Sequence, residues 1–359
     1  MKKALFATTA LVLTAGVAAA EVTVSGDARL GLRYETDTAY ASLMVADDGT
    51  EYIVPGDNSL NVINRVRVKF ALTGESQSGI SFGANLRSDQ HANSGDNNSA
   101  TSGDVWVSGA YGKLTVGDID GALEKAVGDL PEVGLSGLDY WNEFAYATSE
   151  EDDYDFATDT PYGDAGVLYE YAIGDAHIYG SFKDGYYGNS DVKRDAASWA
   201  VGAGYDLGNY SFGIGYERSD YTLSPFTIDD DTLSSMGNGF PIGSGDDSET
   251  WGISGGTSIN GITFKAAYLT TSSDNDMQDY SQYGLGAEYD MTSGVKVAGY
   301  YRVSDFDNQD LKGDAFGIGA AYDLGGGATV KGGIVDTSIE GAGGEVSNTL
   351  ADFGLEFKF

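Results

Sequence analysis

The sequence predicts an all-β protein: a sixteen-stranded antiparallel transmembrane β-barrel whose third long connection, loop 3, folds into the pore. Three observations lead to this prediction. Apolar and polar side chains alternate along most of the chain, positive charges keep to one face of the strands, and long connections alternate with short ones. The composition agrees, because 52 Gly and 24 Tyr among 359 residues are typical of β-structure and not of disorder.

The first twenty residues have the pattern of an export signal. Lys2 and Lys3 precede the uncharged apolar stretch 4–17, and Ala18 to Ala20 supply a cleavage site of small residues. We therefore expect residues 1–20 to be a signal peptide and residues 21–359 to be one barrel domain. The mature chain contains no apolar run of about 18 residues, which argues against helical membrane spans.

Sixteen segments of the mature chain alternate with a period of two residues, as β-strands do. Most are about 8–12 residues long, the length that a tilted transmembrane strand needs. Their cores are 22–36, 60–73, 79–88, 104–111, 113–118, 165–172, 176–183, 197–205, 210–220, 249–257, 262–270, 281–289, 295–303, 314–322, 328–335 and 350–359.

The distribution of positive charge separates a membrane barrel from a soluble sandwich. In the first segment Val24, Leu30 and Leu32 share one face, whereas Arg29 and Arg33 lie on the other. Every Lys and Arg in the strand cores lies on the polar face, except Arg218 near a strand end. A basic residue facing lipid costs roughly 2–4 kcal/mol at the bilayer midplane, whereas a soluble sandwich tolerates occasional charges on its inner face. The near-complete exclusion favours the lipid environment.

The connections and strand ends support an up-and-down barrel. Connections after odd-numbered segments are long and those after even-numbered segments are short, the asymmetry of external loops and periplasmic turns. Tyrosines such as Tyr205, Tyr289 and Tyr322 stand where apolar segments end, as in interfacial aromatic girdles. The strand count is even and both ends of the mature chain are strands, so the first can pair with the last and close the sheet.

Composition excludes several classes of function. The formal charge of −35 argues against nucleic-acid binding. There is no Cys, and only His91 and His177 represent histidine, which removes thiolate chemistry and multi-histidine metal sites. Neither histidine lies in a catalytic motif, so we do not expect an enzyme.

The third long connection, 119–164, carries the candidate site. Sixteen strands enclose a lumen too wide for side chains to fill, so we expect it to hold water and this segment to narrow it. The acidic side of the constriction would come from Asp120, Glu124, Asp129, Glu132 and Asp139. The basic side would come from the inward faces of the first three strands, at Arg29, Arg33, Arg65, Arg67, Lys69 and Arg87. Opposed charges would set a transverse field and influence ion preference.

Several short motifs carry a family resemblance over the whole mature chain. They are Glu21–Arg29, Arg65–Val68, Ser108–Lys113, Gly128–Leu130 with Glu132–Gly134, Tyr322–Ala328, Gly332–Ile334 and the terminal Lys358-Phe359. In these the chain resembles the general-diffusion porins of alphaproteobacteria, of the Rhodobacter type. The resemblance implies a homotrimer in the Gram-negative outer membrane, next to lipopolysaccharide, with an eyelet between loop carboxylates and wall arginines. It also suggests Ca²⁺ bound by loop carboxylates.

For the calcium ligands the acidic run of that loop offers Glu150, Asp152, Asp153 and Asp155. A solvated acidic surface is the other interpretation of such clusters. No cofactor is otherwise expected.

The function expected from the resemblance is passive diffusion of ions and small hydrophilic solutes. The negative net charge and the acidic loop suggest a modest cation preference, which the basic wall could offset. Three alternatives stay open. A substrate-selective channel would need an aromatic ladder, for which Tyr179 and Tyr300 are few; a barrel enzyme would depend on His177; and a structural barrel with a plugged lumen would not conduct.

Overall fold

The computed structural model describes residues 21–36, 42–45, 51–54, 58–91, 99–148, 162–163, 166–187, 194–195, 197–220, 247–291, 293–341 and 344–359. The predicted signal peptide, residues 1–20, lies outside the described residues. No helix in the described part of the chain is long and apolar enough to cross a membrane.

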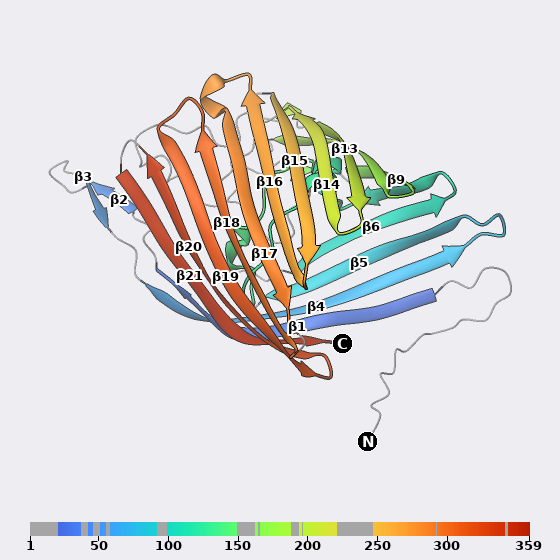
Figure 1. Ribbon diagram of the computed structural model, residues 1–359, viewed down its shortest axis with the longest axis horizontal. Helices are drawn as coiled ribbons and strands as arrows, with labels where there is room; N and C mark the ends of the chain where they lie inside the picture. Colours follow the sequence, from blue (N-terminus) through green and yellow to red (C-terminus); the bar gives the residue numbers. More distant parts are fainter. Residues whose placement is uncertain are drawn as a thin grey trace.

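The described chain forms a closed antiparallel barrel, which confirms the predicted sixteen-stranded barrel (Figure 1). Its strands are β1 (Glu21–Glu35), β4 (Ser59–Glu75), β5 (Ser81–His91), β6 (Ser99–Gly109), β7 (Gly112–Gly117), β9 (Gly166–Ile173), β10 (Ala176–Lys183), β13 (Ser198–Leu207), β14 (Tyr210–Ser219), β15 (Ser248–Ile259), β16 (Ile262–Ser273), β17 (Tyr280–Asp290), β18 (Val295–Phe306), β19 (Leu311–Gly325), β20 (Ala328–Gly341) and β21 (Gly344–Lys358). β1 pairs with β21, from Asp27 opposite Lys358 to Glu35 opposite Leu350. Each strand therefore has two neighbours.

Smaller elements lie in the connections between barrel strands. They are the hairpin of β2 (Ser42–Val45) and β3 (Glu51–Val54), the three-stranded sheet of β12 (Arg194–Asp195), β11 (Gly185–Tyr187) and β8 (Tyr162–Gly163), helix α1 (Ala122–Val127), and the 3₁₀ turns η1 (Leu138–Tyr140) and η2 (Asp276–Gln278). These strands were not predicted, because two to four residues are too few to establish an alternating pattern.

The two faces of the barrel differ as the charge pattern indicates. Large apolar side chains are exposed on the outer face, among them Val62 (69%) and Phe353 (63%). Arg218 is on this outer face near the long-connection end of β14, where it pairs with Asp247 at 2.9 Å and Glu249 at 2.8 Å. These two carboxylates neutralise the charge of Arg218, which explains how an arginine is tolerated on this face.

Several strands extend beyond their predicted cores at the long-connection end. β20 continues to Gly341 instead of residue 335, and β21 begins at Gly344 instead of residue 350. In this extension Asp336 and Glu340 are exposed whereas Val335 and Ile339 are buried. The polar side chains therefore face outward and the apolar ones inward, the reverse of the pattern at bilayer level. The predicted segments were too short because they were recognised by their apolar outer faces, which end where this reversal begins.

Candidate functional site

The described part of the third long connection, residues 119–148, lies against the polar inner face of the barrel. Its helix α1 packs on β10, β13, β14 and β15. Two wall glycines permit this approach: a Cβ at Gly213 would be 1.8 Å from the carbonyl oxygen of Ala126, and one at Gly202 would be 2.3 Å from that of Ala122. Any larger residue at either position would displace the helix. The two glycines therefore allow α1 to pack directly on the strands, and we call this contact the α1 seat.

A buried carboxylate of β21 binds the far part of the segment. Asp352 is 6% exposed and accepts hydrogen bonds from the backbone N–H groups of Leu135 (2.8 Å) and Ser136 (2.6 Å). It also accepts one from the Ser136 hydroxyl, at 2.7 Å. Hydrogen bonds to an ionised acceptor are stronger than neutral ones, so Asp352 is a strong anchor for this part of the segment.

Three more wall residues anchor the end of the segment. Glu217 of β14 accepts hydrogen bonds from the backbone N–H groups of Ala147 (2.6 Å) and Thr148 (2.9 Å). The side-chain oxygen of Gln282 on β17 accepts one from Ala145, and Arg302 of β18 donates to the carbonyls of Trp141 and Glu143. The segment is thereby bound on several sides of the barrel. Sequence reasoning missed these anchors, because each appeared as one more polar residue on an inner face.

The apex of the segment combines an ion pair with backbone strain. Leu138, Asp139 and Tyr140 have φ of 49°, 61° and 50°, the left-handed region that costs roughly 1–2 kcal/mol per non-glycine residue. Leu138 is fully buried, and Asp139 accepts hydrogen bonds from Arg33 at 2.8 and 2.5 Å. Arg33 and Asp139 are both predicted constriction residues, and the structure brings them together.

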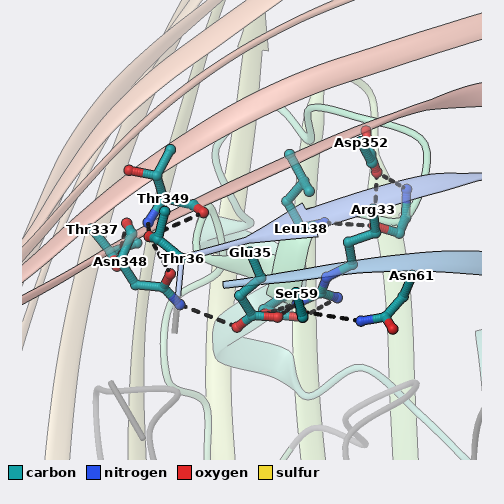
Figure 2. Close-up of polar contacts among 12 residues, drawn as sticks. Arg33, Glu35, Thr36, Ser59, Asn61, Leu138, Thr337, Asn348, Thr349 and Asp352 are labelled. Atoms are coloured by element: carbon teal, nitrogen blue, oxygen red, sulfur yellow. Dashed lines mark hydrogen bonds and ion pairs between the residues drawn. The ribbon is translucent and has the colours of Figure 1, made fainter. Parts of the chain in front are cut away.

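The Arg33 pair belongs to a polar network at the junction of β1 and β21 (Figure 2). Arg33 also donates to Glu35 at 3.2 Å, and Glu35 accepts from the amide of Asn348 at 3.1 Å. The Thr36 hydroxyl donates to the Asn348 side-chain oxygen at 3.0 Å and accepts from the N–H of Thr349 at 2.7 Å. The apex is therefore tied to the place where the first and last strands close the barrel.

The other predicted basic residues line the wall of β1, β4 and β5. Arg29 donates to the carbonyl of Leu135 at 3.2 Å, so it too contacts the segment. Arg65 pairs with Asp27 at 2.8 Å, and Arg67 pairs with the fully buried Asp89 at 2.5 Å.

Two further wall cations complete this surface. Arg87 lies 3.3 Å from Asp89, and Lys69 is exposed opposite Arg87 in the strand register. Wall carboxylates that the sequence analysis did not name thus hold Arg65, Arg67 and Arg87 in a cationic row.

The predicted acidic residues occupy different environments. Asp120 pairs with Lys125 of the same segment, Glu132 is exposed and Glu124 is half-buried. Asp129 accepts a hydrogen bond from the Phe144 N–H at 2.9 Å, and burial raises the pKa of its carboxyl to about 6. Asp139 forms an ion pair with the wall, at Arg33.

The proposed calcium ligands Glu150, Asp152, Asp153 and Asp155 lie outside the described residues. Within the described ranges, no three His, Asp or Glu side chains converge as a metal site would require. The described structure therefore supplies no donor set against which calcium could be placed.

Comparisons with known proteins give one consistent result. The family model described as Gram-negative porin matches residues 7–342. A porin of Rhodobacter capsulatus is 32% identical over 314 residues, covering 78% of this chain and 93% of that protein. A porin of Fuscovulum blasticum is 25% identical over 305 residues, with the same coverages. A porin structure refined at 1.8 Å matches with a TM-score of 0.65 and 28% identity, covering 94% of this chain and all of the other.

Proposed function

The chain belongs to the Gram-negative porin family and is an outer-membrane channel, not an enzyme; from this premise we propose that it passes ions and small hydrophilic solutes by passive diffusion through a charged constriction. The acidic side of the constriction is the segment 119–148, and the basic side is the inner wall of β1, β4 and β5. The observation that carries the proposal is the contact of Asp139 with Arg33, which joins the two sides.

The open groups on each side determine which ions pass. Asp120 and Glu132 on the segment and Lys69 on the wall are exposed, so mobile ions can reach them. A field directed across the opening orders water and slows apolar solutes. The excess of 55 Asp and Glu over 20 Lys and Arg raises the local concentration of cations. We propose a modest cation preference, with the basic row offsetting part of it.

We also propose that the protein is a homotrimer. The side of the barrel with the shortest strands, β7, β9 and β10, would face the symmetry axis. β7 has 6 residues and β9 and β10 have 8 each, whereas β19 has 15. At about 3.3 Å per residue and a tilt near 40°, eight residues rise roughly 20 Å, less than the apolar band of about 25 Å. A neighbouring copy would cover the mismatch that lipid would otherwise have to fill.

Two finer proposals concern the external side. Outward carboxylates at the long-connection end, such as Asp336 and Glu340, would meet lipopolysaccharide phosphates through bridging divalent ions. Calcium bound by Glu150, Asp152, Asp153 and Asp155 would be seen as a saturable signal in calorimetric titration, lost when these residues are replaced by Gln or Asn.

The test of the proposed function is single-channel current through purified protein in planar bilayers. We expect ohmic steps in KCl that close in threes. A folded protein that inserts but carries no current would contradict the diffusion proposal and favour a plugged structural barrel.

A further inference from the structure

A second feature of the lumen lies between the segment 119–148 and the short turns of the barrel. An open recess of about 890 Å³ separates α1 from the short turn between β13 and β14, with Gly208 and Asn209 of that turn at its edge. His177 and Tyr179 of β10 form part of its wall, and Lys265 of β16 lies among the residues that bound it. The recess is thus on the short-turn side of the segment 119–148.

His177 and Tyr179 present a pair of parallel rings. Their centroids are 6.5 Å apart and their planes differ by 10°, because alternate residues of a strand face the same side. Gly204 is opposite His177 in the strand register and adds no side chain, and both rings are partly exposed. Tyr300 does not extend this pair, because it is 2% exposed.

The charged groups around the rings are largely balanced in pairs. His177 Nε2 lies 3.4 Å from Asp206, Lys113 lies 3.5 Å from Glu170, and Lys125 pairs with Asp120. The remaining wall carries hydroxyl groups, among them Ser211 and Thr263, and one more cation, Lys265, whose nearby negative charges are Asp129 and Glu124. Paired charges and hydroxyls offer hydrogen bonds without selecting one sign of charge, which suits an uncharged polar solute.

We propose that this recess is a weak binding site for neutral, hydroxyl-rich ring compounds, the chemical class of sugars. The flat carbon face of such a ring would lie on Tyr179 and His177, and its hydroxyls would bond to Asp206 and the wall hydroxyls. Binding must stay weak, because a solute that cannot leave blocks the channel. The inference deepens the proposed function and rests on it, since the solute reaches the recess through the lumen.

The experiment measures excess current noise and conductance in KCl while maltose is added to the bilayer chamber. Sorbitol, an acyclic polyol, serves as the comparison solute at matched viscosity. In the wild type we expect maltose to produce more excess noise than sorbitol. Tyr179→Ala should weaken the apparent maltose affinity roughly fivefold, whereas Tyr179→Phe keeps the ring and should stay within about twofold.

The matched control is Tyr289→Ala, which removes an aromatic ring from the outer face of β17 and should leave the maltose response unchanged. KCl steps recorded before sugar addition show that each variant is folded and open. Equal noise from maltose and sorbitol in the wild type, or an unchanged response in Tyr179→Ala, would overturn the binding site. Absence of KCl current in the wild type would instead overturn the proposed function, so the two failures are distinguishable.

Discussion

At the scale of single residues, the state of the constriction depends on a few charged side chains. Arg33 fixes Asp139 within three consecutive left-handed non-glycine residues, and Asp352 fixes two backbone N–H groups shortly before this strained turn. A strained backbone persists where its surroundings over-determine it. These contacts therefore decide whether the segment keeps one position against the wall.

Asp139→Asn tests the contribution of the apex ion pair while preserving side-chain shape. We expect a larger and noisier single-channel conductance, because removing a charged hydrogen bond costs about 1–3 kcal/mol and the strained turn would favour relaxation. Arg218→Met, which removes an ion pair from the outer face, is the control and should leave conductance unchanged. Equal conductance in Asp139→Asn and the wild type would show that the pair does not position the segment.

The raised pKa of Asp129 leads us to predict that ion selectivity depends on pH. Burial raises the pKa of its carboxyl to about 6, so the negative charge is present above that pH and is lost as the pH falls through it. Cation preference, measured as the reversal potential in a KCl gradient, should therefore decrease between about pH 7 and pH 5.

Asp129→Asn is the control for this pH step. The variant should have a lower cation preference at pH 7 and show no step near pH 6. A step of the same size in Asp129→Asn would assign the titration to another group.

At the scale of elements, the fit of α1 to the wall depends on the absence of side chains. Gly213 and Gly202 allow the helix backbone to approach strands β14 and β13 at distances that a Cβ would prevent. Glycine normally weakens a strand, so its use at these positions follows from the close approach of another backbone.

Gly213→Val should push α1 away from the wall, because even a Cβ would lie 1.8 Å from the Ala126 carbonyl oxygen. The displaced helix would change the single-channel conductance by a measurable fraction and broaden its distribution. Gly180→Val is the matched control, since a Cβ there meets nothing within 4 Å. Wild-type current in both variants would contradict the close packing of α1 on the wall at Gly213.

The barrel strands could be predicted from the sequence because contact with lipid excludes charged side chains from the outer face. The sixteen predicted segments correspond to the sixteen barrel strands. Arg33 and Asp139, predicted on opposite sides of the constriction, form an ion pair in the structure. The strand extensions were missed because the apolar and polar faces exchange above the bilayer, as Val335 and Asp336 illustrate.

The anchors of the segment were missed for a different reason. Glu217, Gln282 and Asp352 look like solvated lumen residues in sequence, and their burial arises from residues 70 to 217 positions away that dock on them. Local pattern contains no information on such distant contacts. The partners of Arg65 and Arg67 were likewise visible only through strand register.

At the scale of the whole molecule, the unequal height of the wall gives the barrel a distinct side. β19, β20 and β21 have 15, 14 and 15 residues and form a tall wall (Figure 1), whereas β7, β9 and β10 have 6, 8 and 8. The proposed trimer uses the low side as its interface.

Val116→Trp on the outer face of β7 should weaken the trimer, because overpacking a protein interface costs typically 1–3 kcal/mol. Ile318→Trp on the tall wall has similar exposure, 45% against 41%, and should be tolerated because lipid chains adapt to added volume. Mass measured in detergent by light scattering distinguishes trimer from monomer. A trimer retained in Val116→Trp and lost in Ile318→Trp would place the interface on the other side.

The most direct measurement of the charged constriction is the reversal potential of single channels in a tenfold KCl gradient. It should be compared between the wild type and two double variants. The first pair of substitutions, Asp120→Asn with Glu132→Gln, removes acidic groups of the segment; the second, Arg29→Met with Lys69→Met, removes basic groups of the wall. We predict a small cation preference in the wild type, shifted toward anions by the first pair of substitutions and toward cations by the second. Identical reversal potentials in all three proteins would contradict a passage bounded by these two charged surfaces.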